Sequence, residues 1–132
     1  MRVIHFVMVG IAATALSCGS SGSSNTMTGP PPPPMNGVNI TIQDFKFTPA
    51  VDTIKVGTTV QWVNNGPSEH SSVSDTGIWD SGGLTPPSGG TYSALASSFQ
   101  FTFNQTGSFP YHCKIHPPSQ YPSFVGTIVV VN

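Results

Sequence analysis

The sequence has few charged residues, and still fewer basic ones. Charged side chains make up 7% of the 132 residues, with four Lys or Arg against five Asp or Glu. Proteins that bind nucleic acids neutralise the phosphates with clusters of Lys and Arg. The chain has no such cluster, so we do not expect nucleic acid as a partner.

Long apolar segments are also lacking. The longest one runs from Val3 to Leu16, about 14 residues, whereas a helix that crosses a membrane needs about 20. The segment follows Met1 and Arg2 and is typical of the apolar region of a secretory signal. We therefore expect an exported protein.

Cysteine is scarce, with only Cys18 and Cys113 in the chain. A disulfide between them is not expected, because each has a better local explanation. The segment Thr14-Ala15-Leu16-Ser17-Cys18 resembles the bacterial lipoprotein signal, in which the cysteine receives a lipid and becomes the mature N-terminus. The alternative is ordinary cleavage after Ala15, which leaves Cys18 as a free thiol. We expect residues 1–17 to be a lipoprotein signal peptide, and lipid on Cys18 to anchor the protein to a membrane, facing the periplasm or the cell exterior.

The next segment, residues 18–35, has the composition of a tether. Residues 19–29 are almost wholly Gly, Ser, Asn and Thr, a composition that behaves as flexible coil. The run from Pro30 to Pro34 favours extended polyproline II, which acts as a semi-rigid spacer. Such a segment suits a domain that is held away from a membrane surface.

Residues 36–132 carry the pattern of an all-β domain. Apolar residues alternate with polar ones from Val38 to Gln43, the period of a half-buried strand. Phe99, Phe101 and Phe103 are expected to face the core. The stretch 77–96 contains Pro and Gly pairs and is predicted to be a long surface loop. Further strands are predicted at 53–56, 58–63, 98–103 and 127–131. We predict a Greek-key β-sandwich of about seven to eight strands.

Three side chains of this domain are candidate metal ligands. Cys113 and Tyr111 point inward by strand alternation, and the turn after Cys113 returns His116 toward the same point. His70 lies in or just past the loop that follows a strand ending near Val63. One soft sulfur and two imidazole nitrogens favour copper in a trigonal site with a weak fourth ligand. Structural zinc normally takes four protein ligands, a set that is not available here.

The order of these motifs resembles that of the cupredoxins, in particular their plastocyanin-like branch. The resemblance is carried by "TVQWVNNGPSEHSSV", "WDSGGL", "FQFTFNQTGSFPYHCKIHP" and "FVGTIVVVN". It implies one type 1 (blue) copper bound by His70, Cys113 and His116. Family members usually carry an axial methionine where this chain has Phe124. Phe124 is therefore expected as a non-coordinating residue at the axial position, with the amide of Gln120 as the alternative ligand.

The resemblance also implies a function, which is to carry single electrons between redox partners outside the cytoplasm. His116 is the expected surface route for electrons, and His112, beside the cysteine, is a second one. A cytochrome or a copper or haem oxidoreductase is the expected kind of partner. Catalysis is not expected, because Lys114 replaces one histidine of the multicopper oxidase motif and too few histidines remain. Copper binding and delivery without electron transfer is the alternative function.

Overall fold

The computed structural model describes residues 37–43, 45–87 and 97–132. The predicted signal peptide (1–17) and tether (18–35), with Cys18, lie outside these residues. The described part consists of eight strands and contains no helix, so none of it forms a helix that could cross a membrane. The strands are β1 (Gly37–Gln43), β2 (Lys46–Thr48), β3 (Val51–Lys55), β4 (Thr59–Asn64), β5 (Val73–Ser74), β6 (Ser98–Thr102), β7 (Gly107–His112) and β8 (Val125–Val131).

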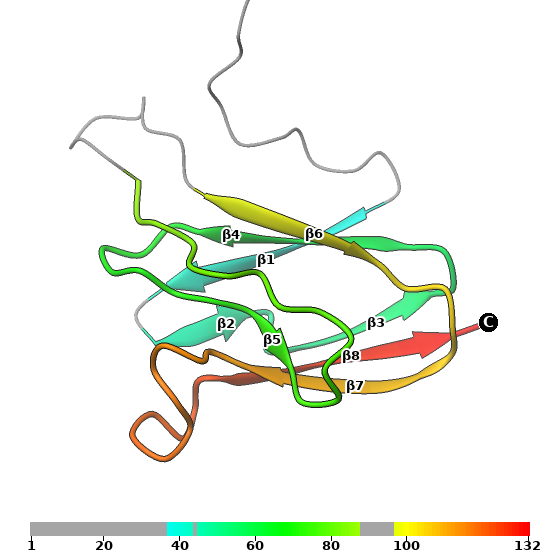
Figure 1. Cartoon of the computed structure of the whole chain (residues 1–132). Coiled ribbons are helices and arrows are strands. Elements are labelled where there is room, and N and C mark those ends of the chain that lie inside the picture. The colour runs from blue at the N-terminus through cyan, green and yellow to red at the C-terminus, as the bar shows by residue number, and fades with distance from the viewer. Residues whose placement is uncertain (1–36, 44, 88–96) are drawn as a thin grey trace, which may run out of the picture.

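The strands form two four-stranded sheets that face each other (Figure 1). One sheet has the order β2-β1-β4-β6 and the other β3-β8-β7-β5. The pairs β1 with β4 and β3 with β8 are parallel, whereas the other neighbours are antiparallel. Because the chain crosses repeatedly between the sheets, segments distant in sequence meet at the ends of the sandwich. The prediction of an all-β sandwich is confirmed.

The core lies between the sheets and is rich in aromatic side chains. Trp62 of β4 lies 5.6 Å from Tyr111 of β7 and 5.3 Å from Trp79, measured between ring centroids. The predicted inward face of β6 is confirmed, since Phe99 packs on Trp62 and Phe101 packs on Trp79. These contacts join the two sheets across the interior.

The loop after β5 sends two side chains into the core. Trp79 and Leu84 are only 5% and 4% exposed. Leu84 forms an isolated antiparallel β-bridge with His70, and Asp80 forms one with Val73. The predicted surface loop is confirmed for residues 77–87, which belong to none of the eight strands and are mostly exposed, with Trp79 and Leu84 as buried exceptions. Residues 88–96 lie outside the described part. Gly and Pro residues divide this stretch into turns, but Trp79 and Leu84 still pack in the core.

Tyr111 is a buried titratable residue in the core. Its side chain is buried against Gly126, where a Cβ would lie 2.2 Å from the tyrosine Cζ. Burial raises the pKa of its hydroxyl well above the ordinary value of 10.0, although the nearby Trp62 indole acts in the opposite direction. In the unfolded chain the hydroxyl ionises near pH 10, so the unfolded state binds fewer protons above that pH.

We therefore expect the free energy of unfolding to fall above about pH 10, with Tyr111 contributing up to about 1.4 kcal/mol per pH unit. Tyr111→Phe removes this contribution and should flatten the alkaline limb. Urea unfolding between pH 8 and 11 measures the effect. An equal alkaline slope in both proteins would contradict it.

Candidate metal centre

The loop after β4 carries His70 and is braced by Asn64. The Asn64 amide donates hydrogen bonds to the carbonyls of Ser68 (2.8 Å) and Leu84 (2.7 Å), and its oxygen accepts one from the N–H of Gly66 (2.9 Å). A Cβ on Gly66 would lie 3.2 Å from Nε2 of His70, so glycine lets the imidazole pack closely here. His70 exchanges backbone hydrogen bonds with Leu84 and is 1% exposed. The loop thus holds a buried histidine at the end of the sandwich.

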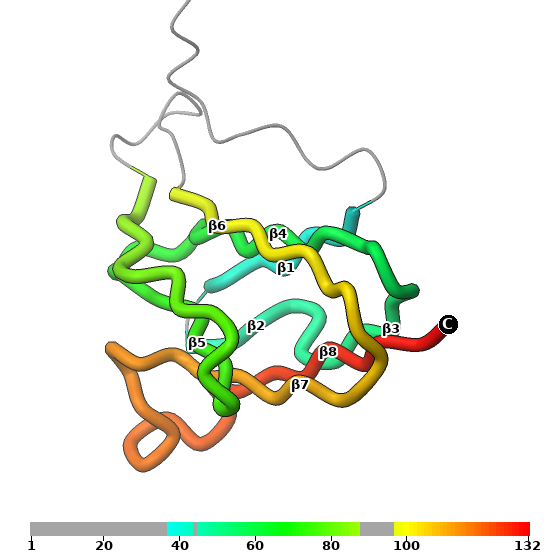
Figure 2. Tube along the Cα trace, turned by 45° about the vertical axis from the view of Figure 1, so that its right-hand side comes forward, coloured from blue at the N-terminus to red at the C-terminus, as the bar shows by residue number. Residues whose placement is uncertain are grey.

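The second loop carries Cys113 and His116 between β7 and β8. The N–H of Cys113 faces the carbonyl of Phe124 at 3.4 Å. The N–H groups of Gln120 and Tyr121 donate to the carbonyl of Pro117, which folds the loop back on itself. The loops after β4 and β7 lie at the same end of the sandwich in both views (Figures 1 and 2).

The three predicted donors meet at one point. The Nδ1 atoms of His70 and His116 lie 3.3 Å apart, and Sγ of Cys113 lies 3.9 Å from Nδ1 of His116. All three donor atoms lie within 4.8 Å of one another. Cys113 is a free, fully buried thiol, whereas His116 is half-buried. The structure therefore brings together all three residues singled out from the sequence.

This cluster fits a metal ion of the predicted kind. Bonds from a metal to imidazole nitrogen and thiolate sulfur are about 2.0 and 2.3 Å long, so one ion can bridge the 3.3 and 3.9 Å separations. Two nitrogens that face each other this closely are both satisfied by a shared cation. A thiolate with two imidazoles is the donor set of trigonal copper sites.

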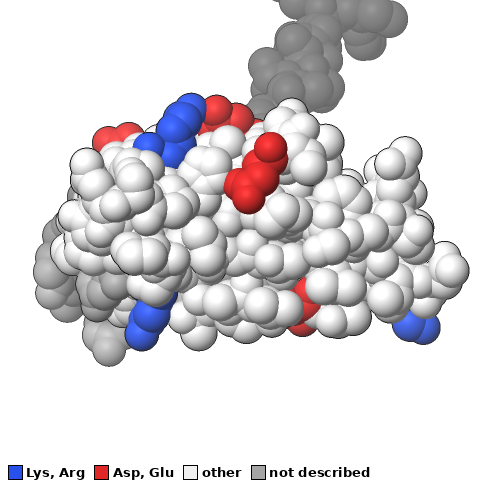
Figure 3. Space-filling view, turned by 90° about the horizontal axis from the view of Figure 1, so that it is seen from below, with Lys and Arg blue, Asp and Glu red and all other residues white. Residues whose placement is uncertain are grey.

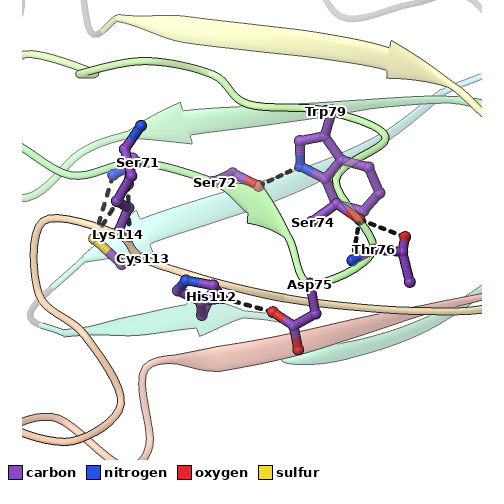
Figure 4. Close-up of polar contacts among 9 residues, drawn as sticks. All are labelled: Ser71, Ser72, Ser74, Asp75, Thr76, Trp79, His112, Cys113 and Lys114. Atoms are coloured by element: carbon purple, nitrogen blue, oxygen red, sulfur yellow. Dashed lines mark hydrogen bonds and ion pairs between the residues drawn. The ribbon is translucent and has the colours of Figure 1, made fainter.

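Ser71 links the two loops around the sulfur (Figure 4). Its N–H donates to Sγ of Cys113 at 3.4 Å, and its hydroxyl lies 3.6 Å from the same sulfur. The hydroxyl also accepts a hydrogen bond from the N–H of Lys114 at 2.9 Å. The sequence analysis missed Ser71, because its position directly after His70 is the only signal that it carries.

Aromatic rings enclose the imidazoles. Phe124 is fully buried, and its ring centroid lies 5.0 Å from that of His70 and 6.3 Å from that of His116. Phe45 and Tyr121 also contact the ring of His116, at 4.9 and 5.2 Å. Gln120 is exposed. Of the two residues considered for the axial position, Phe124 lies against the donors.

A histidine–carboxylate hydrogen bond and an ion pair flank the cysteine. Nδ1 of His112 lies 2.5 Å from Oδ1 of Asp75, and Nζ of Lys114 lies 2.6 Å from Oδ2 of Asp80. Figure 4 shows the His112–Asp75 pair beside the Cys113 side chain. The His112 side chain is 29% exposed, in agreement with its predicted outward orientation. The Lys114 ammonium lowers the pKa of Asp80.

Comparisons with known proteins agree with the family resemblance seen in the sequence. A family described as "Copper binding proteins, plastocyanin/azurin family" matches residues 35–131. The amicyanin of Paracoccus versutus is 31% identical over 84 residues, which cover 64% of this chain and 61% of amicyanin. The chain thus spans less than two thirds of that relative.

Two solved structures share the fold. A purple cupredoxin from Nitrosopumilus maritimus superposes with a TM-score of 0.54 at 24% identity, covering 71% of this chain and 99% of that one. An oxidised amicyanin variant superposes with a TM-score of 0.52 at 26% identity, covering 71% and 81%. A cluster of one thiol and two imidazoles at the end of such a sandwich points to blue copper electron transfer. The chain belongs to the plastocyanin/azurin family of copper-binding proteins and is a cupredoxin with one type 1 copper.

Proposed function

We propose that this protein carries single electrons between redox proteins, with its copper bound by His70, Cys113 and His116. The observation that carries the proposal is the convergence of these three donors, two of them buried, at one end of a rigid sandwich. Bound copper supplies a centre that accepts and releases one electron. The protein's own contribution is to hold the donors in place in both oxidation states.

The surroundings of the donors support this role. Asn64 holds the loop of His70, and Ser71 donates a hydrogen bond to the cysteine sulfur while it accepts one from Lys114. Such partners fix the orientation of metal ligands. A site that is held in place needs little rearrangement when an electron arrives or leaves, which favours fast transfer.

Cyclic voltammetry of the copper-loaded protein tests the proposal. We expect a reversible couple that involves one electron per copper, and rapid oxidation and reduction by a small cytochrome. Copper that binds but exchanges no electrons, or that passes intact to a chelating acceptor protein during the same assay, would favour the alternative of a copper delivery module. The proposed role is that of a carrier and not of an enzyme.

Phe124 is proposed to occupy the axial position without coordinating the copper. Its buried ring against both imidazoles supports this, as does the exposure of Gln120. A phenyl ring offers no lone pair, so the oxidised, more highly charged copper gains no stabilisation from that side. We therefore expect this protein to have a reduction potential that is high in comparison with other members of the family.

Phe124→Met should lower this potential, because a thioether restores weak axial donation. Gln120→Ala is the matched control and should change the potential little. Voltammetry of both variants at one pH measures the effect. A large shift for Gln120→Ala with almost none for Phe124→Met would transfer the axial role to the glutamine.

His116 and His112 are proposed as the routes by which electrons leave and enter. His116 is half-buried, next to Ile115, which is 41% exposed. His112 is partly exposed and directly follows Tyr111 on β7, beside the ligand Cys113. Charged groups are few and scattered on the face shown in Figure 3. A transient redox partner, such as a cytochrome or a copper or haem oxidoreductase, needs only a small contact area.

Export and membrane anchoring through Cys18 are also proposed, on the sequence of residues 1–18. Mass spectrometry of protein purified from membranes should find an acylated cysteine 18 at the N-terminus. Mature protein that begins at Leu16 and remains in the soluble fraction would contradict lipidation and indicate ordinary cleavage after Ala15.

A further inference from the structure

Phe45 has an unusual backbone conformation next to the metal centre. Gln43 of β1 pairs with Lys46 of β2, so Phe45 lies in the turn between these strands. Within the described residues, Phe45 is the one non-glycine residue with a positive φ, 61°. Type I′ hairpin turns need a positive φ at both central residues and favour Asn or Gly there. A bulky aromatic residue at such a position is rare and points to a role for its side chain.

The side chain of Phe45 contacts the metal centre and its neighbour Tyr121. The rings of Phe45 and Tyr121 stack, with centroids 4.3 Å apart and planes inclined by 17°. Both rings meet the imidazole of His116 edge to face, at 4.9 Å and 75° for Phe45 and at 5.2 Å and 88° for Tyr121. Phe45 also meets the ring of His70 at 5.8 Å. The stack thus joins the β1–β2 turn to the loop of His116.

We propose that Phe45 and Tyr121 act as positioning residues that clamp the imidazole of His116. His116 is only half-buried, so core packing on its own does not fix its ring. The stacked pair lies against it, while Phe124 lies roughly parallel to it at 6.3 Å. This arrangement holds Nδ1 of His116 toward His70 and Cys113. The role in copper binding rests on the proposed ligand set, whereas the clamp itself exists without metal.

Phe45→Asn is the most informative substitution, because asparagine suits the positive φ and the hairpin should still form. In the metal-free wild-type protein, NMR should show one set of His116 ring signals with nuclear Overhauser effects to Phe45 and Tyr121. In Phe45→Asn the ring should move faster and lose its contact with Tyr121. Phe109→Leu, which changes an aromatic contact with Phe103 in the core, is the control and should leave the His116 signals unchanged.

With copper bound, Phe45→Asn should raise the dissociation constant roughly tenfold and add a second species to the electron paramagnetic resonance spectrum. Tyr121→Leu, in the loop that carries His116, should also raise the dissociation constant and add a second species. Tyr121→Phe keeps the stack and should match the wild type. An equally rigid His116 ring in metal-free Phe45→Asn and Tyr121→Leu would overturn the clamp. Wild-type protein that lacks thiolate-to-copper absorption would instead overturn the proposed function, and the metal-free NMR result would still decide on the clamp.

Discussion

Cys113→Ser should abolish the intense visible absorption of the oxidised copper protein. That absorption arises from charge transfer between a thiolate and copper, and Cys113 is the one cysteine among the described residues. A serine hydroxyl is a harder and less basic donor, so it does not replace the soft sulfur. The N–H of Ser71, which lies 3.4 Å from the sulfur, then faces the hydroxyl oxygen of the serine in its place.

The matched control is Cys18→Ser in the full chain, since it removes the other cysteine of the sequence. It should retain the full absorption per bound copper. Visible spectra of both variants, taken with the copper content measured on the same samples, give the comparison. Absorption that survives in Cys113→Ser would show that the ligand assignment is wrong.

Asn64→Ala should cause the largest loss of stability among the substitutions considered. Asn64 is fully buried, and its side chain makes three hydrogen bonds to backbone groups of Gly66, Ser68 and Leu84. Each buried group left without a partner costs about 1–3 kcal/mol. The Leu84 carbonyl keeps its hydrogen bond from the N–H of His70, so two groups lose their partner and the sum is on the order of 2–6 kcal/mol. This is a large part of the roughly 5–15 kcal/mol typical of a domain. Copper affinity should fall as well, because the freed loop carries His70.

Asn65→Ala is the control, because the neighbouring asparagine is exposed. Its free energy of unfolding should stay within about 0.5 kcal/mol of the wild type. Urea unfolding of the metal-free proteins separates the stability effect from copper binding. A loss below about 1 kcal/mol for Asn64→Ala would mean that the loop does not depend on this amide.

The strands and the three donors could be predicted because each has a local signal. Alternation from Val38 to Gln43 corresponds to β1, in which Ile40 and Ile42 are buried. Strand alternation also predicted that Cys113 points inward and His112 outward. His116 lies only three residues after Cys113, so the turn between them brings its ring back toward the sulfur. These features depend on neighbouring residues and the period of a strand.

The residues that support the site could not be predicted, since their roles depend on contacts between distant segments. Phe45 lies more than 70 positions before Tyr121, and its segment resembles an ordinary alternating strand. Ser71 is one of two adjacent serines, and only the register of the loops brings it to the sulfur. Trp79 and Leu84 are hidden among turn-forming residues although both are buried. A contact between segments that are distant in sequence produces no periodic pattern from which it could be predicted.

We propose that Cys113, His70 and His116 together bind one copper as a type 1 centre. The most direct test is to titrate the full-length wild-type protein with Cu(II) and record visible and electron paramagnetic resonance spectra at each step. We predict intense thiolate-to-copper absorption that saturates at one copper per chain, with the narrow parallel copper hyperfine splitting of a type 1 site. Stoichiometric copper binding with weak visible absorption and a wide hyperfine splitting would show that these residues do not form a type 1 centre.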